Sequence, residues 1–229
     1  LIAGKQATVD GSGLVTYSAD SHTLYGALTS SPAADWPKGS MRSIVEWDTN
    51  KPLGEIEQVE HTYAVIGNMN EHQLTVVEST WGGRPELVDT TGIIDYGSLM
   101  QLALERAKTA REAIKVMTGL VKKYGYYSSG ESFTIADPNE AWILDLIGKG
   151  PGRRGAVWVA VRIPDDCIAG HANYPRIHKI PMDDKENCLY SPDVISFARE
   201  MGYFDGLNKE FSFARAYSPA DFGALRACD

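Results

Sequence analysis

Three apolar segments of strand length follow one another late in the chain: FTIA at residues 133–136, AWILDL at 141–146 and AVWVAV at 156–161. Asp137-Pro138-Asn139 is a typical turn sequence and separates the first two segments, so we expect residues 133–136 and 141–146 to form a hairpin. A stretch rich in Gly and Arg, residues 148–155, separates the second from the third. Short strands joined in this way predict an antiparallel sheet.

Two helices are predicted just before these strands. Apolar residues recur at helical spacing, first from Leu99 to Arg106 and then from Ala110 to Val121. Thr109 followed by Glu112 fits a capping box, in which each side chain pairs with a backbone N–H that the helix start leaves free. Gly125 ends the second helix. A last short helix is predicted at residues 191–201, with Ser191 as N-cap and Pro192 in the first helical position.

Hairpins are also predicted in the first third of the chain. Residues 1–3 read as the end of a strand, and the turn at 5–13, which contains the sequence DGSG, leads into a strand at 14–20. The stretch 22–51 is rich in Pro, Gly and Ser and is predicted to be irregular, with one short strand at 43–47.

A second hairpin is predicted from residues 63–66 and 74–80, whose β-branched residues are typical of strands, across a turn at 67–71. The order along the chain is therefore strands, two helices, and strands again. This order predicts an α+β fold with mainly antiparallel sheets.

Composition excludes several classes of protein. The 229 residues include 22 Lys and Arg against 30 Asp and Glu, a net charge of −8, and the basic residues are scattered, so nucleic acid is not an expected partner. The longest apolar run, near residues 157–161, is far below the ~20 residues of a membrane span, so no membrane association is predicted. Three cysteines are too few for a disulfide framework and lack the spacing of a zinc site.

The residues by themselves indicate no catalytic chemistry. There is no GxSxG sequence for a serine hydrolase, and the carboxylates beside Cys167 would raise the pKa of its thiol. His171 and His178 are separated by Pro175, which argues against one helix that carries both, and the other histidines are isolated. No metal and no organic cofactor is predicted. These patterns alone support no more than a soluble α+β domain.

Four segments carry a resemblance. They are LIAGKQATVDGS at residues 1–12, IGNMNE at 66–71 with VEST at 77–80, WVAVRIPDD at 158–166, and HAN at 171–173. In this order they resemble peptidase family C69, dipeptidases related to penicillin V acylases and conjugated bile-acid hydrolases among the N-terminal-nucleophile hydrolases.

The resemblance implies a four-layer αββα sandwich. It also implies that residues 1–229 are the N-terminal part of a single catalytic domain that is incomplete on both sides. Members of this family begin with Cys-Thr-x, which would place the nucleophilic cysteine three residues before Leu1. An amino terminus with a reference pKa of about 7.7–8.0 can accept the proton of that thiol. The thiolate would attack the substrate carbonyl, and water would hydrolyse the acyl-enzyme.

The resemblance also implies roles for individual residues. Asp20 matches a carboxylate that orients the amine, and Asn173 is the candidate oxyanion donor, so these two are the expected catalytic residues. Substrate or oxyanion contacts are expected from five more side chains: Tyr17, Asn70, Glu78, Thr80 and Arg215.

This sequence departs from the related enzymes at one position. Many of them have Arg-x-x-Asp where this chain reads Tyr17-Ser18-Ala19-Asp20, so the cation that would stabilise the thiolate is replaced by a neutral phenol. Each assignment also has a plainer alternative. Asp20 and Asn173 could be turn residues, Arg215 a surface residue, and Tyr17 a core residue.

The expected function is a cysteine dipeptidase that hydrolyses short peptides through an acyl-enzyme. The alternatives are an N-acyl amide hydrolase of penicillin V acylase or bile-salt hydrolase type, and an inert binding domain on the same scaffold. A homo-oligomer is left open. An exported protein is slightly favoured over a cytoplasmic one, because a cysteine at the mature terminus requires upstream processing.

Overall fold

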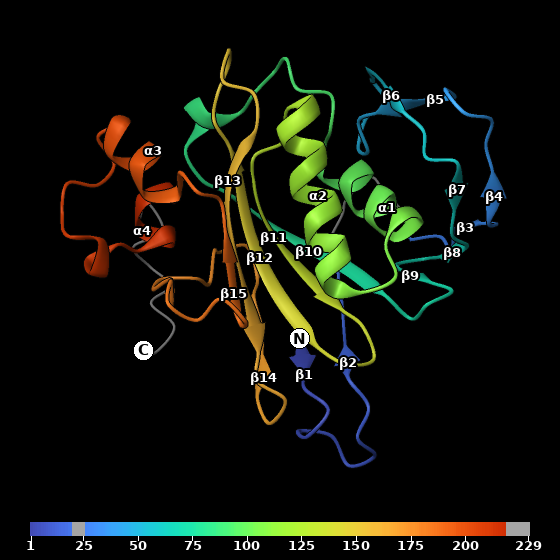
Figure 1. The fold of residues 1–229 in the computed structure, drawn as a ribbon, viewed down its shortest axis with the longest axis horizontal. Coiled ribbons are helices and arrows are strands. Elements are labelled where there is room, and N and C mark those ends of the chain that lie inside the picture. The colour runs from blue at the N-terminus through green and yellow to red at the C-terminus, as the bar shows by residue number, and fades with distance from the viewer. Residues whose placement is uncertain (20–25, 219–229) are drawn as a thin grey trace.

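An eight-stranded antiparallel sheet, here called the large sheet, forms the centre of the molecule (Figure 1). The computed structural model describes residues 1–19 and 26–218. Across the large sheet the strands follow the order β15 (Cys188–Tyr190), β13 (Ala156–Ile163), β12 (Ala141–Gly148), β11 (Gly130–Ala136), β10 (Thr75–Gly82), β9 (Met69–Asn70), β8 (Val65–Ile66) and β3 (Ser30–Ser31).

Smaller elements surround this sheet. The small sheet has β1 (Ile2–Ala3) between β14 (Ile168–Ala169) and β2 (Leu14–Val15). Two further pairs are β4 (Ala34–Asp35) with β7 (His61–Thr62), and β5 (Met41–Val45) with β6 (Pro52–Glu57). The helices are α1 (Tyr96–Arg106), α2 (Ala110–Tyr124), α3 (Val194–Glu200) and α4 (Phe213–Tyr217), with 3₁₀ turns at Pro85–Leu87 and Asn208–Glu210.

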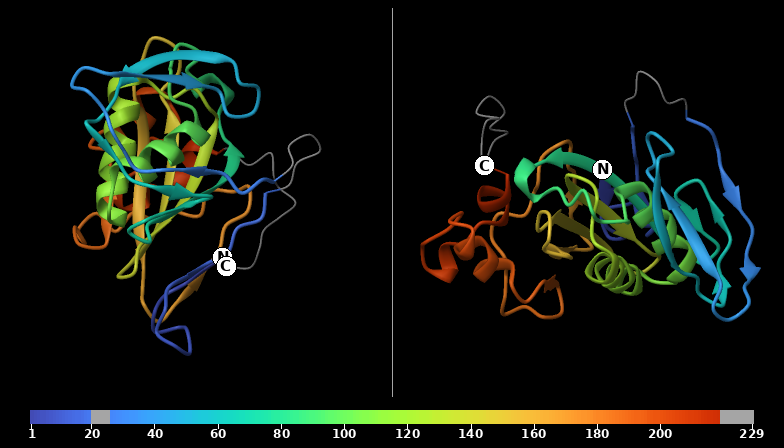
Figure 2. Two further views of the ribbon diagram at one scale, coloured as in Figure 1. Left: turned by 90° about the vertical axis from the view of Figure 1, so that its right-hand side faces the viewer. Right: turned by 90° about the horizontal axis from the view of Figure 1, so that it is seen from above.

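The two faces of the large sheet contribute to different cores. On the helix face, alternate residues such as Val76, Ile135 and Trp142 pack with the apolar sides of α1 and α2. On the opposite face, called here the small-sheet face, residues such as Ile143 and Val159 pack with Ile2 of β1 and with α3 and α4. Seen from above, the N-terminus and α2 lie on opposite sides of the sheet (Figure 2, right).

The predicted α+β fold with mainly antiparallel sheets is confirmed. The layers formed by α1 and α2, by the large sheet and by the small sheet follow one another. Helices α3 and α4 pack on the same face of the large sheet as the small sheet, and the four-layer sandwich and the domain boundaries stay predictions.

Helices α1 and α2 and the hairpin of β11 and β12 occur where the sequence predicts them, whereas α4 was not predicted. Thr109 Oγ1 accepts the N–H of Glu112 at the start of α2, but the Glu112 carboxylate accepts the N–H of Lys108, one residue before the expected position in the capping box. Asp137 in the hairpin turn also accepts the N–H of Ala110 at 2.8 Å. This hydrogen bond therefore fixes the start of α2 against the β11–β12 turn.

The second predicted hairpin is wrong in its pairing. Residues 63–66 and 74–80 are not direct partners, because β9 lies between β8 and β10. Gly67, with a φ of 53°, allows the chain to reverse at once between β8 and β9. The carboxamide of Asn70 then closes the next turn by accepting the N–H groups of His72 and Leu74.

Two other predictions need correction. The helix predicted at residues 191–201 is α3, which begins at Val194 rather than near Ser191, because the Ser191 hydroxyl accepts the N–H of Trp158 on β13 and does not cap the helix. The first hairpin is confirmed by the pairing of β1 with β2, but its second strand is only Leu14–Val15. The stretch predicted as irregular holds β3 and β4 as well as β5, within its described residues.

Candidate active site

A row of polar side chains crosses the small-sheet face of the large sheet. Ser79 on β10 pairs with Ser132 on β11, which pairs with Asp145 on β12, so the three lie side by side on neighbouring strands. Thr134 lies two residues further along β11 and therefore on the same face. The segment of residues 171–177 lies across this row, and each of these side chains takes part in holding it.

Asp145 anchors the far end of that segment. It is 0% exposed and accepts hydrogen bonds from Ser132 Oγ at 2.5 Å and from the backbone N–H groups of Arg176 at 3.0 Å and Ile177 at 2.9 Å. Burial raises the pKa of this carboxyl to about 6, although the three hydrogen bonds favour its charged form.

His171 and Asn173 are held at the near end. His171 Nε2 lies 2.7 Å from Thr134 Oγ1, and burial lowers the pKa of this imidazole to about 4, so it is uncharged at neutral pH. Asn173 has a φ of 46°, a left-handed conformation that Asn tolerates. Its backbone N–H donates to Ser79 Oγ and its Nδ2 donates to the Thr80 carbonyl, both at 2.6 Å. A carboxamide has two N–H donors, so a second N–H of Asn173 is left for a ligand.

The small sheet brings β1 alongside this segment. Ile2 pairs with Ala169 of β14 on one side and with Val15 of β2 on the other. Ile2 is buried toward the large sheet, whereas Leu1 is 66% exposed and its backbone nitrogen donates to the Thr16 carbonyl at 3.0 Å. Because side chains alternate along a strand, every second residue of β1 faces the large sheet.

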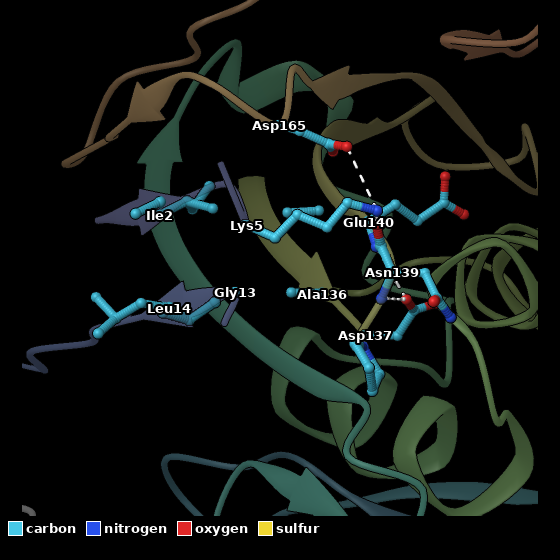
Figure 3. Close-up of a pocket in the computed structure, with 13 residues that line it drawn as sticks. Ile2, Lys5, Gly13, Leu14, Ala136, Asp137, Asn139, Glu140 and Asp165 are labelled. Atoms are coloured by element: carbon cyan, nitrogen blue, oxygen red, sulfur yellow. Dashed lines mark hydrogen bonds and ion pairs between the residues drawn. The ribbon is translucent and has the colours of Figure 1, made fainter. Parts of the chain in front are cut away.

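A polar anchor fixes the other end of β1 (Figure 3). Lys5 Nζ donates to the Asn139 carbonyl at 3.2 Å and forms an ion pair with Asp165 at 3.4 Å. Gly4 is needed beside it, because a Cβ there would lie 2.4 Å from the Asp165 carbonyl oxygen. A small pocket lies between the β1–β2 hairpin and the β11–β12 turn, lined by Lys5, Asp165 and neighbouring residues. Gly4 and Lys5 therefore hold the end of β1 against the large sheet.

A second group of polar side chains lies on the opposite face of β10. Glu78 and Thr80 share that face, and Glu131 lies directly opposite Thr80 on β11. The Tyr17 hydroxyl donates to Glu78 Oε1 at 2.5 Å, and Thr80 Oγ1 donates to Glu131 Oε2 at 3.1 Å. Burial, and then the neighbouring Glu78, raise the pKa of Glu131 well above its usual range. Burial also raises the pKa of Tyr17, so its phenol remains a donor.

Of the seven residues expected at the site, Tyr17, Glu78 and Thr80 form one group on the helix face of β10, whereas Asn173 is held on the small-sheet face and reaches only the backbone carbonyl of Thr80. Asn70 is 4% exposed, and its carboxamide makes four hydrogen bonds, donating to the carbonyls of Leu104 and Ala107 as well as accepting the two N–H groups of its own turn. This leaves none of its hydrogen-bonding positions free for a substrate. Asp20 lies outside the described residues.

Arg215 is on α4, where its side chain is exposed, and it has no ion pair with any described residue. No group of three or more His, Cys, Asp or Glu within residues 1–19 and 26–218 is arranged to hold a metal ion. Among the helices in those ranges, none has the length and apolar character that crossing a membrane requires.

Comparison with known proteins places the chain in a family. The model of peptidase family C69 matches residues 1–229. The chain belongs to peptidase family C69. A probable dipeptidase of Salmonella dublin is 29% identical over 245 residues, which cover 95% of this chain and 52% of the relative. A probable dipeptidase of Latilactobacillus sakei is 35% identical over 100 residues, covering 44% of this chain and 20% of the relative.

A probable dipeptidase B of Streptococcus pyogenes serotype M1 is 28% identical over 122 residues, covering 53% of this chain and 23% of the relative. The chain therefore spans about half the length of the Salmonella relative and less of the other two.

Several residues at this C69 site were not predicted. Ser79, Ser132, Thr134 and Asp145 hold the segment that carries Asn173, yet none was a candidate. A signal for one of them exists in the sequence, because Asp145 interrupts an otherwise apolar strand, AWILDL. A buried carboxylate requires partners, so such a residue indicates a polar contact across the sheet.

Proposed function

We propose that this chain forms part of the active site of a cysteine dipeptidase, with the nucleophile three residues before Leu1. Membership of family C69 and the names of three relatives support a peptidase. The register of β1 is the observation that carries the rest of the proposal. Ile2 pairs with Ala169 and Ala3 with Ile168, so each step back along β1 is one step forward along its partner.

The residue three before Leu1 would extend this strand alongside the segment after Ala169, which bends at residues 172–174 and carries Asn173. On the other side, β2 pairs Ile2 with Val15, so the same residue would lie beside the chain that follows Val15. It would also share the orientation of Ile2, toward the large sheet and the row formed by Ser79 and Ser132. A thiol in this position would therefore have the candidate oxyanion donor Asn173 as a neighbour.

The chemistry follows from this placement. The α-amine of the cysteine accepts the thiol proton, and Asp20 orients and stabilises the resulting ammonium. The thiolate attacks the carbonyl of the scissile peptide, and the free N–H of Asn173 stabilises the oxyanion. The leaving amine takes the proton from the α-ammonium group of the cysteine. Water then hydrolyses the thioester, with the α-amine of the cysteine as base. No step requires a metal or an organic cofactor.

The full-length protein tests this proposal. Replacement of the cysteine three residues before Leu1 by Ala is expected to abolish dipeptide hydrolysis, whereas EDTA is expected to leave the rate unchanged. Dipeptide hydrolysis that survives the substitution would exclude the mechanism. A side-by-side assay with N-acyl amides distinguishes a dipeptidase from an acylase, and a protein that binds these compounds without turnover would be a binding domain.

A further inference from the structure

Arg176 is an exposed arginine in the segment that carries Asn173. Its backbone N–H donates to the buried carboxylate of Asp145 at 3.0 Å, so its place above the large sheet is fixed. Arg176 is exposed between two buried residues, Pro175 and Ile177, and Ile177 packs in the core of the small-sheet face. The side chain of Arg176 therefore points away from the large sheet, where a ligand can reach its guanidinium.

The guanidinium of Arg176 has no carboxylate partner in the described part of the chain. None of the ion pairs among residues 1–19 and 26–218 includes it, and its backbone N–H makes its one hydrogen bond within those residues. The chain holds 30 Asp and Glu against 22 Lys and Arg, so carboxylates are not scarce. Asp145 already accepts three hydrogen bonds. The guanidinium is therefore available to an anion.

Arg176 and Asn173 are fixed to the same row of side chains. The N–H of Asn173 is held by Ser79 on β10 and that of Arg176 by Asp145 on β12, with one strand between them. Two strand spacings place these backbone positions roughly 10 Å apart. Burial is the main cause of the low pKa of His171, and the guanidinium of Arg176 is one of the charges that lower this pKa further. The guanidinium therefore lies near the start of the segment.

The anion that fits a dipeptidase site is the free α-carboxylate of its substrate. In a dipeptide, less than about 4 Å separates the scissile carbonyl carbon from the carboxylate carbon, as the standard bond lengths require. With one hydrogen bond at each end, the donors to these two groups lie at most roughly 12 Å apart. Arg176 is close enough to Asn173 along the segment to meet this limit. A guanidinium also matches a carboxylate with two parallel hydrogen bonds.

We propose that Arg176 binds the α-carboxylate of the dipeptide and thereby makes the site select a free carboxyl terminus one residue after the scissile bond. This inference rests on the proposed function. Each further residue of a longer peptide moves the carboxylate about 3.3 Å away from the scissile bond. A dipeptide amide carries no charge at that position, so its binding leaves the guanidinium without a partner.

The test uses the full-length enzyme with a dipeptide and the C-terminal amide of the same dipeptide. We expect Arg176→Gln to lower kcat/KM for the dipeptide about 10–100-fold, mainly through KM, because charge-assisted hydrogen bonds are lost. For the dipeptide amide, kcat/KM is expected to stay unchanged. Arg176→Lys keeps the charge without the paired donors, so its loss should be smaller. Arg154→Gln, which alters an exposed arginine between β12 and β13, is the matched control.

The outcomes separate the two proposals. Equal loss with both substrates, which is expected if Arg176 pairs with a carboxylate elsewhere in the full-length protein, would overturn its role and leave the dipeptidase proposal standing. An unchanged kcat/KM for the dipeptide, or wild-type enzyme that hydrolyses the dipeptide and its amide equally well, would do the same. Wild-type enzyme that hydrolyses neither would instead contradict the proposed function. If Arg176→Gln does not fold, Arg176→Lys is expected to show the same selective loss at smaller size.

Discussion

The two faces of the large sheet use the same strands for different purposes. On the helix face, β12 contributes Trp142 and Leu144, both 0% exposed, to the core beneath α1 and α2. On the small-sheet face, the same strand contributes Asp145, also 0% exposed, which fixes the backbone of residues 176 and 177. The three side chains are equally buried. Trp142 and Leu144 stabilise the fold, whereas Asp145 positions the segment that carries Asn173.

This difference predicts how variants behave. A change on the helix face lowers the free energy of unfolding but leaves the geometry around Asn173 intact. A change on the small-sheet face moves segment 171–177 and lowers the rate even where the protein stays folded. The predictions below test this separation.

The largest effect is expected for Trp142→Ala. The indole packs against α2 and lies under the guanidinium of Arg111, whose Cζ is 4.7 Å from the ring centroid. Removal of so large a buried side chain is expected to lower the free energy of unfolding by about 3–5 kcal/mol, measured by urea denaturation. Trp36→Ala, at a side chain 39% exposed, is the control and should cost much less. A loss of kcat in the folded Trp142 variant would show that the two faces are coupled.

Asn173→Gly is expected to have the next largest effect, and on rate rather than on stability. Glycine keeps the left-handed backbone conformation but removes the carboxamide, so kcat for a dipeptide should fall by roughly 10²–10³ through loss of the oxyanion donor. The melting temperature should change little. Asn50→Gly is a matched control, since Asn50 has a φ of 57° in the β5–β6 turn, away from the site. Unchanged kcat in the Asn173 variant would remove this residue from the mechanism.

Local sequence signals explain which parts of the fold could be predicted. Helices α1 and α2 and the β11–β12 hairpin have strong periodicity, a cap at Thr109 and a turn sequence, so their positions follow from neighbouring residues alone. The two-residue strands β3, β4, β8 and β9 are too short for any alternation to be visible. β3 and β4 pair with β8 and β7, which lie far along the chain, whereas β8 and β9 pair with each other across the reversal at Gly67.

The site was less predictable for the same reason. The resemblance to family C69 indicated Asn173 and Glu78, but the contact of Asn173 with Ser79 joins residues 94 positions apart. Asn70 shows that a motif can also mislead. It belongs to a family motif, but all hydrogen-bonding positions of its carboxamide are occupied by backbone groups of this chain. A motif identifies a residue type, whereas the contacts determine what remains free for a ligand.

A smaller effect on stability is expected from the titration of Asp145. Its pKa of about 6 in the folded state is above the value of about 3.9 in an unfolded chain. Between these values the folded state binds more protons, so the contribution of this group to stability should fall as pH rises from 4 to 6, by at most about 1.4 kcal/mol per unit.

Asp145→Asn isolates this contribution. The amide keeps an oxygen for the N–H groups of Arg176 and Ile177 and offers its NH₂ to Ser132, so the network survives without the charge. The difference in free energy of unfolding between wild type and variant should therefore change between pH 4 and 6. Asp183→Asn, at an exposed carboxylate, provides the control. A difference that is constant with pH would mean that Asp145 does not titrate in this range.

The smallest effect is expected from Thr109→Ala at the start of α2. This change removes the hydroxyl that accepts the N–H of Glu112 and should cost about 1 kcal/mol in free energy of unfolding. Thr109→Ser retains the hydroxyl and should recover most of the loss. Because α2 packs on the helix face, kcat for a dipeptide should be unchanged in both variants. A fall in kcat with Ala that Ser restores would show that the start of α2 reaches the site through Asp137, which accepts the N–H of Ala110.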